Sequence, residues 1–149
     1  MTMRNFLILS VGLMLGPVAA AEDEASNLSP TVIVHYETVV EGLKSADLAA
    51  IYLGRKSTWD SGRRIILALP AASDSVTKVF IRQVLHKSVS QFRAYWRRRL
   101  FSGGGGLPKT LRSSSEVLEF VAGTPGAIGV IDESVEIPDK SVWVVDITN

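Results

Sequence analysis

Short continuous apolar runs and segments with helical spacing follow one another along the chain. Runs rich in β-branched residues occupy positions 31–36, 64–69, 127–131 and 141–146. Short apolar runs bounded by turn residues are typical of strands buried on both faces. Gly129 falls inside the third run, which indicates a bulge or a close approach of another backbone at that point.

Two helices are predicted between the first strand and residue 87. The first begins at Ser45, which we expect to be the N-cap, and ends at Gly54. The second follows the strand over 64–69 directly. Ser73 or Asp74 caps its start, and apolar residues recur at three- and four-residue spacing as far as Leu85.

Two further helices are predicted after residue 87. Ser88 and Gln91 have the spacing of a capping box, and the third helix runs from there to the glycine run at 103–106. Residues 108–111 are expected to form a loop. A second capping box, at Ser113, opens a fourth helix over 114–121. The order of elements predicts an α/β layer fold with a mixed, mostly parallel sheet flanked by helices, in one domain over 22–149.

The first twenty-one residues have the pattern of a signal peptide. Arg4 supplies a positive charge, residues 6–15 form an apolar core too short to span a bilayer, and small residues at 18–21 suit a signal peptidase. An uncleaved membrane anchor is the alternative. Export to a bacterial periplasm is the simplest expectation, with no stable membrane anchor after cleavage of the segment 1–21.

Composition excludes several function classes. The chain contains no cysteine, which removes disulfides, thiolate metal sites and a cysteine nucleophile. The formal net charge of +1 gives no support for nucleic-acid binding. The two histidines, His35 and His86, stand near no nucleophile motif and no metal-ligand spacing occurs, so we expect no enzymatic activity, no metal and no cofactor. His35, at a strand end, is expected to be a structural residue.

The start of the second helix is the candidate ligand site. A helix N-terminus placed directly after a strand presents free N–H groups that attract anions. Ser73, Ser75 and Thr77 add hydroxyl groups there, and Arg97 in the third helix is a candidate counter-charge. The alternative is that the hydroxyl groups only cap and solvate the helix, and that Arg97, Arg98 and Arg99 form a solvated face, since consecutive residues fan out around a helix.

The chain resembles the phosphate-type periplasmic substrate-binding proteins of ABC transporters. Three segments carry the resemblance, in the same order as in that family: SADLAAIYLGRKSTWDSGRRI, FRAYWRRRLFSGGGGLP and SSSEVLEFVAGTPGAIGV. It implies a single periplasmic-binding-protein-like lobe. Full-length members are about twice as long and clamp an oxyanion between two lobes.

The chain departs from the family pattern at three positions, one of which is Val130, which follows Gly129 where the family has tyrosine. The arginine of the family's Arg…Ser-Gly-Thr signature falls on Pro70, and its serine falls on Asp74, whose carboxylate repels phosphate. Ser73, Asp74, Ser75, Thr77 and Arg97 therefore form the candidate oxyanion site, with a changed charge pattern.

Two functions follow as expectations. The first is an exported module that binds phosphate or another small oxyanion. The second is an interaction or regulatory module without a ligand, acting on an ABC permease or a periplasmic sensor domain through the face over residues 93–99. A monomer or a weak homodimer is expected in either case.

Overall fold

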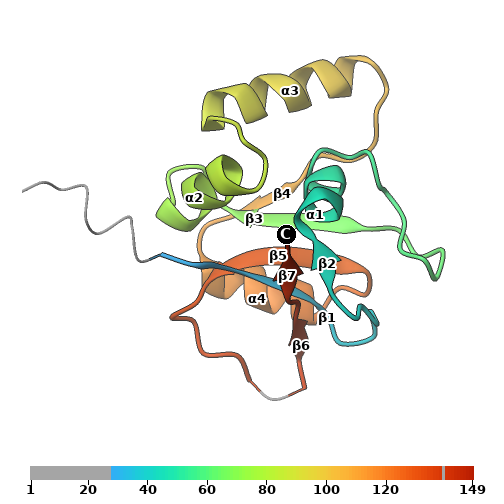
Figure 1. The fold of residues 1–149 in the computed structure, drawn as a ribbon, viewed down its shortest axis with the longest axis vertical. Helices are drawn as coiled ribbons and strands as arrows, with labels where there is room; N and C mark the ends of the chain where they lie inside the picture. The colour runs from blue at the N-terminus through green and yellow to red at the C-terminus, as the bar shows by residue number, and fades with distance from the viewer. Residues whose placement is uncertain (1–27, 139) are drawn as a thin grey trace, which may run out of the picture.

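The computed structural model describes residues 28–138 and 140–149, so the expected signal segment lies outside the described residues. A five-stranded sheet in the order β4-β3-β5-β1-β6 forms the centre of the molecule (Figure 1). Its strands are β1 (Pro30–His35), β3 (Ile66–Pro70), β4 (Lys109–Leu111), β5 (Ala127–Asp132) and β6 (Val142–Val144). The helices are α1 (Ser45–Tyr52), α2 (Ser75–Gln83), α3 (Val89–Phe101) and α4 (Ser114–Ala122). Two short strands, β2 (Leu43–Lys44) and β7 (Ile147–Thr148), pair in parallel beside the main sheet.

Strand directions confirm the predicted mixed, mostly parallel sheet. β3 pairs in parallel with both β4 and β5. β1 lies between β5 and β6 and is antiparallel to both. Four of the five strands therefore run in one direction, and only β1 runs in the other.

Both faces of the central strands β1, β3 and β5 are buried, as the continuous apolar runs at 31–36 and 64–69 predict, whereas Trp143 and Val144 in the edge strand β6 are more than half exposed. Successive residues in a strand point to opposite faces, so β1 sends Val32 and Val34 to one core cluster and Ile33 to the other. The first cluster contains residues of α1, α2 and α3, and the second contains those of α4. Figure 1 shows α1 and α2 on one side of the central strands and α4 on the other.

Helix starts agree with the predicted caps in three of four cases. Ser88 and Gln91 form both bonds of a capping box at α3. The Asp74 carboxylate accepts a hydrogen bond at the start of α2. At α4 the Ser113 hydroxyl accepts from the N–H of Glu116, but the Glu116 carboxylate accepts from the N–H of Arg112 instead of Ser113, so the predicted second capping box forms only one of its two bonds. The prediction for Ser45 is wrong: Lys44 holds the N-cap position, because β2 leads directly into α1 and Ser45 is already helical.

Two strand predictions also need correction. Residues 109–111 form β4 rather than a loop, because their backbone pairs with β3, although their sequence has no apolar run. The last predicted strand, over 141–146, is shortened to β6. The backbone N–H of Val145 still donates to the carbonyl of Val32 in β1, and β7 then follows and pairs with β2.

The family-like segments contact one another directly. The indole N–H of Trp59 donates to the carbonyl of Gly126 over 2.9 Å, which joins the loop after α1 to the turn before β5. The same carbonyl accepts from the backbone N–H of Ile66 at 3.2 Å.

The phenolic hydroxyl of Tyr52 donates to the backbone carbonyl of Ala68 in β3. Complete burial raises the pKa of Tyr52 far above its ordinary value.

Gly129 marks a close approach between β5 and α4, one of the two alternatives read from the sequence. A Cβ atom at this position would lie 2.6 Å from Cγ1 of Val117 and 2.8 Å from Cγ2 of Val121. Both valines are fully buried in the α4 cluster. Only glycine lets the helix pack at this distance from the strand.

Gly129→Ala is expected to destabilise the protein by about 1–3 kcal/mol, because the new methyl group overpacks the core. Gly105→Ala is the matched control, since a Cβ there meets nothing within 4 Å. Urea unfolding measures both variants, and adding Val117→Ala to Gly129→Ala should recover part of the loss. Equal midpoints for the two single variants would contradict this packing.

Candidate functional site

Helix α3 is fixed against the C-terminal end of α1. The hydroxyl of Tyr95 donates to the carbonyl of Leu53 over 2.7 Å. The guanidinium of Arg99 donates to the carbonyl of Gly54. Carbonyl groups at a helix end have no partner within the helix, so α3 supplies the donors that α1 lacks there. Residues from two distant segments are thereby held together.

The glycine run lies against Arg99 and lets the chain turn back after α3. A Cβ atom on Gly104 would lie 2.6 Å from Cγ of Arg99, and one on Gly54 would lie 2.8 Å from Nε of Arg99. Any side chain at either position would displace the arginine. The glycines at 54 and 104 are therefore required by the packing of Arg99.

A groove with a volume of about 770 Å³ lies between the start of α2, α3 and the segment 107–110. It brings together three of the five predicted site residues, namely Ser73, Thr77 and Arg97. Asp74 and Ser75 do not line it. Ser90, Arg93 and Thr110 also line the groove; of these, Ser90 and Thr110 escaped the sequence analysis. Its apolar lining consists of Leu69, Pro70, Ala71, Ala72, Ile81, Val89, Phe92, Trp96, Leu100, Leu107 and Pro108.

The start of α2 is already occupied by groups of the chain itself. The Asp74 carboxylate accepts from the backbone N–H of Val76 over 3.0 Å. The hydroxyl of Thr77 donates to the carbonyl of Pro70 over 3.1 Å, and Thr77 is buried. Ser73 and Arg97 are exposed. Ser73 and the arginines of α3 are therefore the groups best placed to reach a ligand in the groove.

His35 has the structural role expected from the sequence. It is buried, and its Nδ1 accepts from the backbone N–H of Glu37 over 3.2 Å. β1 is antiparallel to β5, whereas β3 is parallel to it. The C-terminal end of β1 at His35 and the C-terminal end of β3 at Pro70 therefore lie at opposite ends of the strands. The described part of the chain contains no group of three or more His, Cys, Asp or Glu side chains that could hold a metal ion.

No helix within the described ranges is both long and apolar enough to cross a lipid bilayer.

A putative phosphate ABC transporter substrate-binding protein with bound phosphate, from Clostridium perfringens, shares this fold, with a TM-score of 0.62 and 18% identity over 86% of this chain and 51% of that one. An ABC-type phosphate transport receptor from Vibrio cholerae matches with a TM-score of 0.60 and 19% identity, over 80% of this chain and 46% of that one. PstS from Borrelia burgdorferi matches with a TM-score of 0.58 and 17% identity, over 81% of this chain and 47% of that one. The chain thus spans about half the length of the structures it matches, and the resemblance read from the sequence is confirmed for the fold.

No protein-family model and no curated protein sequence matches the chain.

Arg99→Ala is expected to destabilise the protein by about 1–3 kcal/mol, because it removes a charged donor and the stem that packs between two glycines. The neighbouring Arg98→Ala is the control and should stay within about 0.5 kcal/mol, since Arg98 is exposed. Thermal unfolding followed by circular dichroism compares the two variants. A loss in Arg98→Ala as large as that in Arg99→Ala would refute the proposed docking of α3.

Proposed function

We propose that this chain is an exported, periplasmic binding module that holds a small oxyanion such as phosphate in the groove between α2 and α3. The observation that carries the proposal is the convergence of Ser73 from the start of α2 with Arg97 and Arg93 from α3. The fold shared with phosphate-binding proteins supports the class of protein. The ligand is inferred from the groove.

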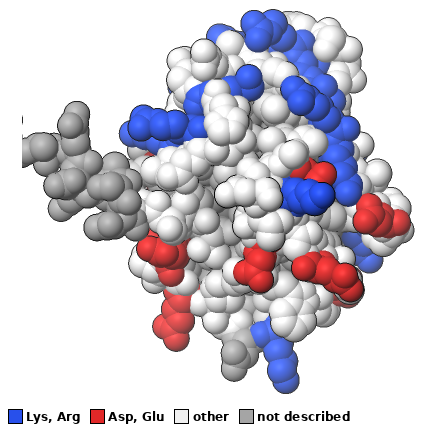
Figure 2. Space-filling model, viewed as in Figure 1, with Lys and Arg blue, Asp and Glu red and all other residues white. Residues whose placement is uncertain are grey.

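Charge supports an anionic ligand or partner at this surface. Between Asp74 and Glu116 the chain contains no acidic residue. The same segment contains nine basic residues, Lys78, Arg82, Lys87, Arg93, Arg97, Arg98, Arg99, Lys109 and Arg112. Figure 2 shows Lys and Arg gathered over the upper part of this face, where α2 and α3 lie, and Asp and Glu mainly over the lower part. The resulting positive potential attracts anions to the groove.

The expected affinity is low. Ser73, Arg93 and Arg97 are exposed, and an ion pair between exposed groups contributes only about 0–1 kcal/mol. Two such arginines and one hydroxyl add up to at most about 3 kcal/mol, which corresponds to a dissociation constant of about 6 mM or weaker for a free inorganic ion. A second lobe or a partner protein that covers the groove would exclude water and strengthen every one of these contacts.

The alternative function is an interaction module that binds an ABC permease or a periplasmic sensor domain through the face over residues 93–99. One observation favours it: large apolar side chains are exposed next to the basic face, with Phe101 91% exposed and Leu100 and Leu107 about half exposed. Exposed apolar groups beside arginines are frequent in protein interfaces. Such a module would bind no free anion.

Arg97→Gln is expected to weaken phosphate binding by up to about fivefold, because it removes a positive charge from the groove. Isothermal titration at low ionic strength measures the affinity, and Arg98→Gln is the control, since Arg98 does not line the groove. If phosphate produces no heat with the unaltered protein at a concentration of about 50 mM, well above the expected dissociation constant, the anion-binding function is wrong and the interaction module is favoured.

Asp74→Ser is expected to strengthen phosphate binding by about two- to fivefold, because it removes a negative charge next to Ser73 and keeps a side-chain oxygen for the N-cap. Asp47→Ser is the matched control, since Asp47 occupies the first turn of α1 and does not line the groove. The same titration gives both affinities. An unchanged affinity in Asp74→Ser would place the ligand away from the start of α2.

A further inference from the structure

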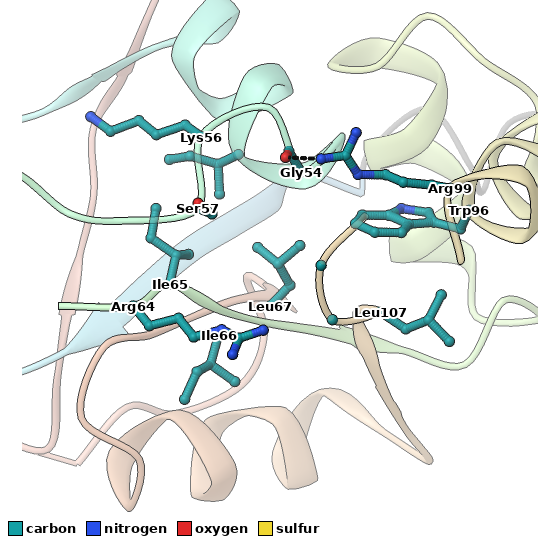
Figure 3. Close-up of a pocket in the computed structure, with 13 residues that line it drawn as sticks. Gly54, Lys56, Ser57, Arg64, Ile65, Ile66, Leu67, Trp96, Arg99 and Leu107 are labelled. Atoms are coloured by element: carbon teal, nitrogen blue, oxygen red, sulfur yellow. Dashed lines mark hydrogen bonds between the residues drawn. The ribbon is translucent and has the colours of Figure 1, made fainter. Parts of the chain in front are cut away.

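A second, smaller cavity of about 280 Å³ lies on the other side of α3, between the end of α1, the start of β3 and the glycine run (Figure 3). The side chains of Arg64 and Arg99 line the cavity on opposite sides. Nη2 of Arg64 lies 3.3 Å from the place of a Cβ on Gly106, so this guanidinium reaches the glycine run. Two cations from distant parts of the sequence thus share one cavity.

The two arginines have no anionic partner in the described part of the chain. None of the described salt bridges involves Arg64 or Arg99, and no Asp or Glu lines the cavity. Lys56 also belongs to the lining, but its ammonium group points away from the cavity in Figure 3 and pairs with Asp60 at 3.2 Å. The cavity therefore contains uncompensated positive charge.

Trp96 and Arg99 carry buried donors without an acceptor. The indole N–H of Trp96 and the Nε–H of Arg99 have no hydrogen-bond partner among the described residues, and Trp96 is only 4% exposed. The indole groups of Trp59 and Trp143 both donate to backbone carbonyls. Buried donors are rarely left unpaired, so an acceptor at this cavity would remove a real energetic cost.

The glycine run leaves the wall of the cavity open to a ligand. A Cβ atom on Gly105 would meet no atom within 4 Å, so free space adjoins this residue. The backbone of Gly105 and Gly106 lines the cavity without side chains. The opposite floor is apolar, with Ile51, Ile65 and Leu67, and a water-poor floor strengthens hydrogen bonds to charged groups.

We propose that this cavity is a second binding site, distinct from the groove between α2 and α3, and that it takes a small oxyanion of the phosphate or sulfate type. Arg64 and Arg99 neutralise the charge of the anion from two sides. With a small shift of the glycine run, an oxygen atom of the anion accepts from the indole N–H of Trp96, while Arg99 contributes its charge. The absence of side chains on Gly105 and Gly106 gives the anion room.

Nuclear magnetic resonance of the tryptophan indole groups tests this site on the full chain. Inorganic phosphate and, separately, sulfate are titrated while the three indole N–H signals are followed, with Trp96→Phe used to assign the signal of Trp96. The signal of Trp96 is expected to move with saturation, whereas those of Trp59 and Trp143, which already have acceptors, stay in place. An unmoved Trp96 signal at millimolar phosphate and sulfate would overturn the proposal.

Two matched pairs of variants locate the anion. Arg64 is exposed, so Arg64→Gln should weaken the titration of the Trp96 signal by up to about fivefold, and Arg63→Gln should not weaken it, because Arg63 pairs with Glu37 and does not line the cavity. Gly105→Asp should abolish binding by placing a carboxylate in the wall, whereas Gly105→Asn, which has the same shape without the charge, should leave it within about threefold. Full binding by Gly105→Asp would contradict the site.

The groove variants separate this proposal from the proposed function, since Trp96 lines both the groove and the cavity. A response that Arg97→Gln removes and Arg64→Gln leaves intact would place the anion in the groove and refute the second site. The reverse result would support the cavity and count against the groove. Two responses, one sensitive to each variant, are the outcome that both proposals predict together.

Discussion

The attachment of α3 to the end of α1 is the contact on which both candidate sites depend. Tyr95 and Arg99 donate to the last carbonyls of the α1 region, and the glycines at 54 and 104 give Arg99 the space to do so. Trp96, between these two side chains in the sequence, lines the groove on one side and the smaller cavity on the other. A shift of α3 would change the shape of both.

This arrangement gives the arginine run two different roles. Arg99 is held by the chain and forms part of a wall, whereas Arg97 and Arg93, one turn apart, line the open groove. Arg98 lines neither. The glycine run turns back across Arg99 and reaches Arg64, which makes it one wall of the smaller cavity.

Local chemistry made much of the fold predictable. The caps at Asp74, Ser88 and Ser113 depend on residues only two or three positions apart, and the buried strands depend on continuous apolar runs. β4 was missed because three residues with little apolar character become a strand only when β3 lies beside them. The predicted cap at Ser45 failed because β2, paired with β7 near the far end of the chain, moves the helix start.

The candidate site was predictable only in part, for the same reason. Ser73 and Arg97 were identified from a helix start and a basic helix, and the structure brings them to one groove. The hydroxyl of Thr77 is used in a hydrogen bond to the carbonyl of Pro70, and this bond forms only when β3 and α2 are packed together. The convergence of Arg64 and Arg99 has no local signal, since two separate segments and a glycine run must fold together to produce it.

Both proposed anion sites lie against α3, one at Arg97 and one at Arg64 and Arg99. Both can be located in a crystal structure of the protein soaked in tungstate, because the metal is found by its anomalous scattering. We expect one peak within hydrogen-bonding reach of Arg97 in the groove and a second between Arg64 and Arg99 beside Trp96. Anomalous peaks only at other surface positions, with both cavities empty, would contradict this expectation.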